Sequence, residues 1–343
     1  MSLNAAPSSS SGVPVVWVVA IVLIAAGAGV ALTASVLTAH SSAPGNVTVT
    51  DDLGRTVTVP YDPARVVVFG ASNVDLLYRL GLRSHIVGVD CYAPAFGGLN
   101  EDYSPDQVAL WNLTPSMCVE VEPSTDALKP TLVNLTPSLV ISATIVSVPI
   151  LDEVSTQLGI PVIFLQPSWL GGIVTDVGLV GQIFGVQSAA SALAASLNAE
   201  LSRAANVVAN ETDNGTALPT VLLTYDATAS GPYAGYYTYG PGTFGQSLLE
   251  LTGASSISAN ATTPYPELTP AQVLADQPDL IVYGVGFGVN LSNYSAVPDW
   301  SDLTAVTGSN ITAINSNWIA EPDPTMILEG VPALLAYFQL HSG

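Results

Sequence analysis

The sequence predicts an α/β protein with two Rossmann-like lobes, joined by a single long rigid helix and preceded by an N-terminal transmembrane helix. Short apolar strands alternate with helical stretches along most of the chain, which is typical of parallel sheets covered by helices on both faces. An Ala- and Leu-rich stretch, Gln187 to Asn210, separates two such series, and its roughly 24 residues would form a helix of about 36 Å. An uncharged, mostly apolar run, Val13 to Ala39, precedes them.

These features divide the chain into a series of expected segments. They are a short N-terminal tail (1–12), a transmembrane anchor or signal segment (13–39), a linker (40–47), an N-terminal α/β lobe (48–170), an interlobe helix region (171–210) and a C-terminal α/β lobe (211–343).

The N-terminal lobe is expected to open with a β-hairpin. Residues 47–50 and 56–59 alternate between Val and Thr around the turn at Asp52 to Gly54, a pattern that predicts two paired strands. Further strands are expected at 65–69, 85–89, 139–141 and 161–165, with a helix at 72–80 that ends at Gly81.

The C-terminal lobe is expected to repeat this scheme, with strands at 220–225 and 280–283 and a helix at 243–251. A weak internal duplication supports the repeat, because Pro130–Ile141 and Pro270–Val282 each read as a short helix, a proline and a buried strand. Ser188 is the expected N-cap of the long helix between the lobes.

Residues 13–39 are long enough to cross a bilayer, because about 20 apolar residues suffice for a helix. A secretory signal peptide normally carries a basic segment and a shorter apolar stretch of about 7–15 residues, whereas the first basic residue here is Arg55. No Cys stands directly after the run, since the first cysteine of the chain is Cys91, so a lipid anchor is not supported. We expect an uncleaved anchor, with a processed signal or pilin-like leader, or a buried core helix, as alternatives.

The charge balance excludes one class of partner. Six Lys and Arg residues stand against 27 Asp and Glu, a formal net charge of −21, and such a chain repels nucleic-acid phosphates. Hydrophobic residues make up 49% of the chain, so it is not disordered. Only 10% of the residues are charged, which suits an acidic medium, where carboxylates are partly protonated.

Glycosylation sequons indicate an exterior location for the part of the chain after the apolar run. Sequons occur at more of the asparagines than the frequency of Ser and Thr predicts, and all of them follow the run; a merely polar surface is the alternative. They are Asn46, Asn112, Asn134, Asn210, Asn214, Asn260, Asn290, Asn293 and Asn310.

Cys91 and Cys118 are the only cysteines. Outside the cell such a pair is expected to be oxidised. With no Cys-x-x-Cys spacing and only His85 near them in sequence, a structural disulfide is favoured over a metal or redox site.

Eight short motifs occur in order along the chain, namely Asp51–Pro60, Pro63–Val67, Leu80–Val89, Leu158–Val162, Gly240–Phe244, Tyr265–Leu268, Pro278–Ile281 and Asn317–Trp318. Their succession resembles that of one family, the ABC-transporter solute-binding proteins for iron complexes (siderophore or haem) and vitamin B12. The resemblance covers roughly residues 48 to 340. It implies an extracellular binding subunit rather than an enzyme, without a cofactor or bound metal of its own, that works with an ABC permease and its ATPase.

A ligand of such a fold lies in the crevice outside the carboxyl ends of the parallel strands. Loops at those ends carry aromatic side chains that stack on flat ligands, together with small polar ones. An ordinary packed aromatic is the alternative for each, least so for Tyr233–Tyr239, because four tyrosines at this irregular spacing fit no strand or helix face. The candidates are Phe69, Ser72, Asn73, Tyr92, Trp169, Tyr233, Tyr236, Tyr237, Tyr239, Phe287 and Trp318.

The distribution of cations constrains the ligand. No Lys or Arg follows Arg203, and anionic ligands usually require arginine. We therefore favour a neutral, flat ligand such as a corrinoid, with iron held by tyrosine oxygens as the alternative. Backbone amides that hold an anion would weaken this preference.

The resemblance also implies one glutamate per lobe that pairs with arginines on the permease, about seven residues before the proline that leads into a buried strand. Pro130 and Ala271 occupy those positions, and Asp126 and Glu267, four residues earlier in each lobe, are the expected substitutes. The alternative is that the binding fold has been reused as a glycosylated cell-surface or adhesion component.

Other chemistries find little support in the sequence. Gly284–Gly288 follows a strand but is not followed by the helix that a dinucleotide-binding fingerprint requires. The three histidines are isolated from one another, so no zinc site is expected. No Gly-x-Ser-x-Gly motif is present, so a serine hydrolase is not supported.

Overall fold

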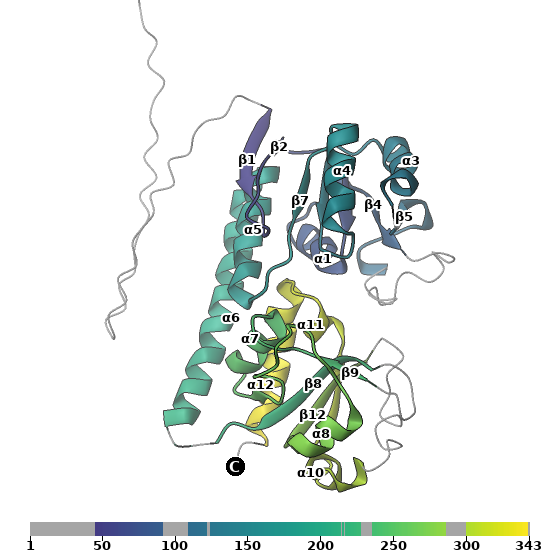
Figure 1. The fold of residues 1–343 in the computed structure, drawn as a ribbon. Coiled ribbons are helices and arrows are strands. Elements are labelled where there is room, and N and C mark those ends of the chain that lie inside the picture. The colour runs from purple at the N-terminus through teal and green to yellow at the C-terminus, as the bar shows by residue number, and fades with distance from the viewer. Residues whose placement is uncertain are drawn as a thin grey trace, which may run out of the picture. The chain divides into compact units, whose positions relative to one another are not determined.

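The computed structural model describes residues 45–91, 109–121, 124–213, 215, 217–227, 235–285 and 300–341. The first lobe contains two sheets (Figure 1). β1 and β2 form an antiparallel hairpin, and five parallel strands follow in the order β5-β4-β3-β6-β7. Its elements are β1 (Asn46–Thr50), β2 (Thr56–Pro60), β3 (Val66–Phe69), α1 (Ala71–Arg79), β4 (Ile86–Cys91), β5 (Cys118–Glu120), α3 (Thr125–Leu135), β6 (Leu139–Ser142), α4 (Val148–Leu158), β7 (Val162–Phe164) and α5 (Leu170–Phe184).

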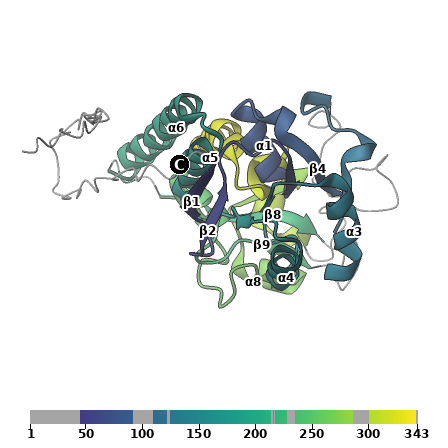
Figure 2. The same ribbon diagram turned by 90° about the horizontal axis from the view of Figure 1, so that it is seen from above.

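Both faces of the first parallel sheet are buried, as its continuous apolar strands predict. Val66 and Val68 of β3 belong to a hydrophobic cluster that includes residues of α1 and α5. Val67 and Phe69, which point the other way because side chains alternate along a strand, belong to a second cluster with residues of α3 and α4. Figure 2 shows α1 and α4 on opposite sides of this sheet.

The second lobe holds a mixed sheet in the order β11-β9-β8-β12-β13, with β10 also paired to β8. β8, β10, β12 and β13 are parallel, whereas β9 is antiparallel to both β8 and β11. The elements are β8 (Thr220–Ala227), β9 (Tyr236–Thr238), α7 (Phe244–Leu251), β10 (Ser255–Ser256), β11 (Glu267–Leu268), α8 (Pro270–Asp276), β12 (Leu280–Val285), α10 (Thr304–Thr307), β13 (Ile311–Asn315), α11 (Asn317–Ala320), a π-helical turn (Met326–Gly330) and α12 (Val331–Gln339). The sequence had suggested that the second lobe repeats the scheme of the first. The mixed sheet shows that the repeat is only partial.

The predicted internal duplication is nevertheless present in the backbone. α3 and α8 each end at a non-glycine residue in the left-handed region, Thr136 (φ 45°) and Gln277 (φ 48°), directly before a proline. The second residue after each left-handed one, Ser138 or Asp279, donates its N–H to the residue at the start of the neighbouring central strand, Arg65 or Thr220. The same device thus directs the chain into β6 and into β12.

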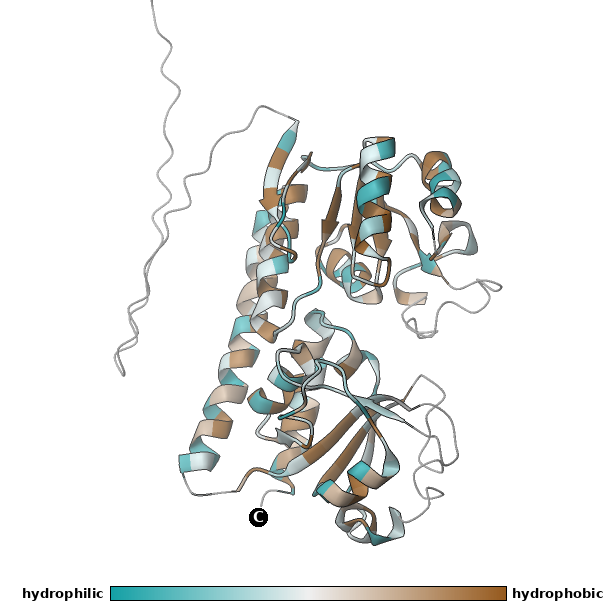
Figure 3. Ribbon diagram, viewed as in Figure 1, coloured by the Kyte–Doolittle hydropathy of each residue, from teal (hydrophilic) through white to brown (hydrophobic). Residues whose placement is uncertain are grey.

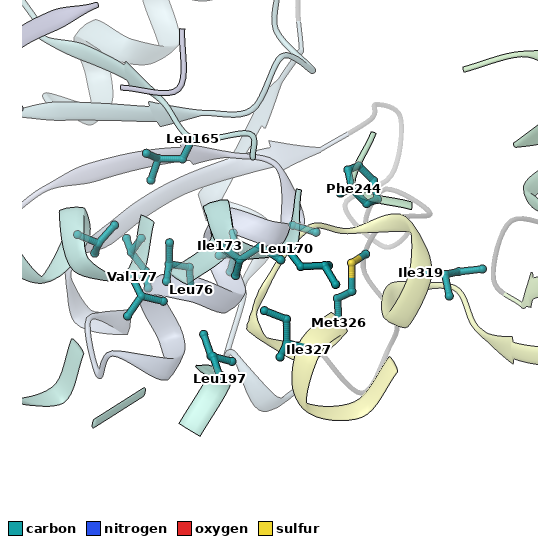
Figure 4. Packing of buried hydrophobic residues seen from close by; sticks show 14 of the residues in the cluster. Leu76, Leu165, Leu170, Ile173, Val177, Leu197, Phe244, Ile319, Met326 and Ile327 are labelled. Atoms are coloured by element: carbon teal, nitrogen blue, oxygen red, sulfur yellow. The ribbon is translucent and has the colours of Figure 1, made fainter. Parts of the chain in front are cut away.

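α6 (Gln187–Asp213) lies between the last helix of the first lobe and the first strand of the second. It begins at Gln187, so Ser188 lies within its first turn, and the prediction that Ser188 is the N-cap was wrong. One buried cluster contains Leu76 of α1, Ile173 and Val177 of α5, Leu197 of α6, and Met326 and Ile327 of the second lobe. Figure 4 shows these side chains together. The two lobes therefore share one apolar core beside α6.

The hydropathy of the elements agrees with this packing. Figure 3 shows the strands of both sheets as apolar, while the long helix alternates between apolar and polar residues. Among the residues that the structure describes, no helix is both long and apolar enough to cross a membrane. The expected transmembrane segment, 13–39, lies outside the described residues.

Candidate functional site

A pocket of about 440 Å³ lies between α5, α6 and α7. Its wall contains residues 169–171, 174 and 175 at the start of α5, Asn198 and Leu201 of α6, and Ser247 and Leu251 of α7. Both lobes contribute, since α5 belongs to the first and α7 to the second. The wall is mostly apolar and none of these residues is charged, so the pocket suits an uncharged, largely apolar group.

Trp169 combines exposure with a defined position at this pocket. It is 58% exposed and precedes the first residue of α5. Its ring lies across Gly171, where an added Cβ would overlap the ring atoms. Gly171 therefore provides the seat for the indole, which presents a surface on which a flat ligand can stack.

Two of the first-lobe candidates have structural roles. Phe69 has no exposed surface and packs in the core between the sheet, α3 and α4, so its assignment to the ligand site was wrong. Asn73 is 2% exposed, and its Nδ2 donates to the carbonyl oxygens of Phe69 (3.1 Å) and Leu165 (3.3 Å). Asn73 thus joins the carboxyl ends of β3 and β7 instead of reaching for a ligand.

The tyrosine run was also misinterpreted. Tyr236 lies in β9, is 3% exposed and stacks on Trp300 with 4.7 Å between the ring centroids. Tyr239 is 1% exposed, and its hydroxyl donates to the carbonyl of Ile319 at 2.7 Å. Both are core residues of different clusters, Tyr236 within β9 and Tyr239 directly after it. Tyr237 is only partly buried, with its ring 6.4 Å from that of Tyr225.

The remaining aromatic candidates differ in what the structure says of them. Trp318, in α11, is partly buried and packs against the core shared by the lobes. Tyr92, Tyr233 and Phe287 lie outside the described residues. Tyr265, which was not among the candidates, is 45% exposed and meets Tyr239 edge-on at 6.2 Å. Its place in a motif of the resemblance was the available signal.

A polar junction between the lobes was not anticipated either. The backbone N–H of Ser72, at the start of α1, donates to Oε2 of Glu321 at 3.2 Å. Arg79, on the same helix, donates to Oγ1 of Thr325 at 2.7 Å. The residues of each pair are separated by more than two hundred positions, so no local pattern reveals them. The one feature of the sequence that pointed to this junction is the i, i+4 spacing of Asp75 and Arg79, which allows an ion pair on one face of a helix.

A pair of carboxyl groups, buried Asp176 and exposed Asp52, lies between the β1–β2 turn and α5. Asp176 is 2% exposed, and its carboxyl group is hydrogen-bonded to that of Asp52. Burial, with the charge of Asp52 beside it, raises the pKa of Asp176 to about 8. Partial desolvation also raises the pKa of Asp52, although this residue is exposed at the surface. The pair therefore shares a proton in conditions where isolated aspartates are ionised.

The two residues expected to contact a permease are both exposed but have different neighbours. Asp126, in the first turn of α3, has a 92% exposed side chain and pairs with Lys129 at 3.3 Å. Glu267, in β11, is exposed, and its side chain folds over Gly235.

The sequons and cysteines can also be placed. Five of the sequon asparagines are exposed, namely Asn46, Asn112, Asn134, Asn210 and Asn260, and Asn310 is partly buried. Asn214, Asn290 and Asn293 lie outside the described residues. Cys91 and Cys118 form a disulfide between the neighbouring strands β4 and β5, with their Cα atoms 5.4 Å apart. Within the described ranges, no group of three or more His, Cys, Asp or Glu side chains is placed to hold a metal ion.

Known proteins resemble this chain along most of its length. A cobalamin-binding protein of Halobacterium salinarum is 28% identical over 288 residues, covering 82% of this chain and 71% of the relative. A structure from an Fe³⁺-hydroxamate transport system of Saccharomonospora viridis superposes with a TM-score of 0.67 at 20% identity, over 85% of this chain and 98% of the other. The vitamin B12-binding protein of Vibrio cholerae superposes with a TM-score of 0.63 at 19% identity, over 82% and 99%.

The two solved structures support the two-lobed α/β fold. The sequence profile described as "Periplasmic binding protein" matches residues 66–327. This range contains the main sheet of each lobe and the helices α5, α6 and α7 that form the pocket, but not the β1–β2 hairpin. The chain therefore belongs to the periplasmic binding protein family.

Proposed function

We propose that this protein is the extracellular, membrane-tethered solute-binding subunit of an ABC importer and that it captures a corrinoid between its lobes. The observation that carries the proposal is the uncharged pocket to which both lobes and α6 contribute, with Trp169 exposed beside it. A solute bound there contacts both lobes at once. Relatives described as cobalamin- or vitamin B12-binding proteins support the choice of solute.

Charge supports the same choice among the solutes that such proteins carry. Anionic solutes require compensating cations in a buried site, yet the pocket wall has no charged residue. No Lys or Arg occurs anywhere after Arg203. A neutral solute with flat surfaces therefore fits better than a haem with its propionates or an oxyanion. A ferric siderophore remains the second solute of the proposal.

The shared core supports limited movement between the lobes. α6 is one connection between the lobes. A second connection is the buried cluster to which α1 and α5 of the first lobe and residues 326–331 of the second lobe also contribute. Separating the lobes would expose this apolar surface to water, which costs a free energy of about 25 cal/mol for each Å² exposed. The proposal is therefore a rigid link that permits only a small closure on the solute.

Docking on the permease is assigned to Asp126 and Glu267, one in each lobe, and the tether to residues 13–39. One observation favours the alternative of a reused surface component. Asn134 stands eight residues after Asp126 on α3, about 12 Å along the helix, and is exposed. A glycan on Asn134 would crowd a partner at Asp126.

The solute assignment can be tested by titrating the full-length chain with cobalamin, a ferric hydroxamate and haem while Trp fluorescence is recorded. Of the five tryptophans, Trp111 and Trp300 are fully buried and Trp169 is exposed, so quenching by a solute in the pocket should fall in Trp169→Phe. Trp318→Phe, at the partly buried candidate of α11, separates the contribution of that residue. Strong quenching by haem but not by cobalamin would reject the corrinoid. Silence from all three, with a folded protein, would favour the surface component.

A further inference from the structure

α1 of the first lobe meets residues 321–329 of the second in a network of side chains. Arg79 Nε lies 2.7 Å from Asp75 Oδ2, and an Arg79 Nη donates to Thr325 Oγ1, also at 2.7 Å. Thr325 Oγ1 in turn donates to Asp75 Oδ2 at 3.0 Å. Thr325 therefore links both members of the Asp75–Arg79 pair to the other lobe. Glu321, which accepts from the N–H of Ser72, adds a second link.

The network contains more carboxyl groups than cations. Asp75 and Arg79 face it from α1, and Glu321, Asp323 and Glu329 face it from the second lobe, with Glu329 3.6 Å from Arg79. Tyr239 is a further titratable group facing Glu321. Arg79 is the one cation among the described groups of this network, and Asp75 already occupies its Nε.

Asp323 is the group that cannot be neutralised by a partner cation when the lobes are in contact. It is 2% exposed, and its Oδ1 accepts the N–H of Met326 at 2.9 Å. Burial raises the pKa of Asp323 well above its ordinary value, and the charges of Asp75 and Glu321 add to the shift, while Arg79 opposes it. Burial also raises the pKa of Asp75 despite Arg79.

We propose that this junction is a proton-dependent lock between the lobes, closed while Asp323 is neutral and released when Asp323 is ionised. With a proton on Asp323, Asp75 is the one carboxylate of the network that is almost fully buried, and it pairs with Arg79, whose side chain is 26% exposed. Without it, two carboxylates are buried against one guanidinium, and the contact with α1 is weakened. The lock is independent of which solute is bound.

The sign of the pH effect follows from proton linkage. The closed junction holds a proton on Asp323 at pH values where an exposed aspartate has lost it. Between those two pKa values, opening releases one proton, so the equilibrium constant for opening rises by up to about tenfold per pH unit. The junction is closed in acid and opens as the pH rises.

The location of the lock gives it a consequence for the binding site. Ser72 and Asn73 stand at the carboxyl end of β3, and Asn73 also holds the end of β7, from which the chain continues to Trp169. Opening at α1 would loosen this edge of the sheet. A solute is therefore held more firmly in acid than at neutral pH.

Amide hydrogen exchange on the full-length chain between pH 4 and pH 8, corrected for the intrinsic rate at each pH, tests the lock. Peptides that cover 71–79 and 321–330 should lose protection with rising pH, by up to about tenfold per unit. Asp323→Asn should make the profile of these peptides flat, because an asparagine oxygen can still accept from Met326. Asp276→Asn, at an exposed position of α8, is the matched control and should keep the wild-type slope.

Thr325→Val provides a second variant that does not depend on Asp323. It removes the hydroxyl that joins Asp75 and Arg79 to the second lobe while keeping a similar volume, so both peptides should exchange faster even at pH 4. A flat profile in the wild type would overturn the proposal. So would a slope that persists unchanged in Asp323→Asn, since another group would then carry the proton.

Discussion

Replacing Asp176 with Asn tests whether the pairing of buried Asp176 with Asp52 makes the protein more stable in acid than at neutral pH. In the folded protein the pKa of Asp176 is raised from 3.8 to about 8. The folded state therefore binds a proton that the unfolded state has released between these values, and the free energy of unfolding falls as the pH rises through this window. Oδ1 of Asp176 has no hydrogen-bond partner among the described residues, so no other group there compensates the charge.

The size of the effect follows from the shift. Each pKa unit corresponds to about 1.4 kcal/mol, so about three units between pH 4 and pH 7 correspond to at most about 4 kcal/mol. Asn resembles the protonated acid and can still donate to Asp52. Asp176→Asn should therefore match the wild type at pH 4 and exceed its stability at pH 7 by up to about 4 kcal/mol.

Urea unfolding of the full-length chain, followed by circular dichroism at several pH values from 4 to 8, measures this difference. Asp276→Asn, which removes an exposed carboxylate, should leave the difference from wild type independent of pH. The reasoning is refuted if Asp176→Asn is destabilised equally at all pH values, or if its advantage does not grow with pH.

Three further predictions concern stability. Replacing both Cys91 and Cys118 with Ser removes a cross-link across a sequence separation of 27 and should lower the free energy of unfolding by about 3.5 kcal/mol, measured by urea unfolding with and without reductant. Leu197→Ala creates a cavity at a fully buried position of the shared core and should cost about 3 kcal/mol; a loss under 1 kcal/mol in the same assay would mean that α6 does not depend on that contact. Tyr239→Phe removes the hydrogen bond to Ile319 and should cost about 1–2 kcal/mol, with circular dichroism otherwise unchanged.

Much of the fold could be predicted because its signals are local. The apolar strands around Val66–Phe69 and Leu139–Ser142 lie within one or two residues of their expected limits. A proline after a short helix marked both repeats, and the structure shows why, since Thr136 and Gln277 turn the chain in the left-handed region. The antiparallel strand β9 was missed because a three-residue strand offers too little alternation to detect.

The candidate site was harder to predict because burial is not a local property. Phe69 and Trp169 both follow or end a strand, yet one is fully buried and the other 58% exposed. Tyr239 is satisfied by a carbonyl 80 residues away, which removes the usual objection to burying a phenol. The junction of Ser72 with Glu321 depends on contacts between the lobes, which no spacing in the sequence reveals.

The central claim is that the pocket between α5, α6 and α7 holds the solute, and calorimetric titration of cobalamin into full-length wild type and Ser247→Trp tests it most directly. The large indole should fill the pocket, so we predict a Kd of about 1 μM or below in the wild type and at least about a hundredfold weaker binding in the variant. Ser202→Trp, on an exposed part of α6, should bind as the wild type does. Undiminished cobalamin binding by Ser247→Trp, or none by the wild type, would contradict the account.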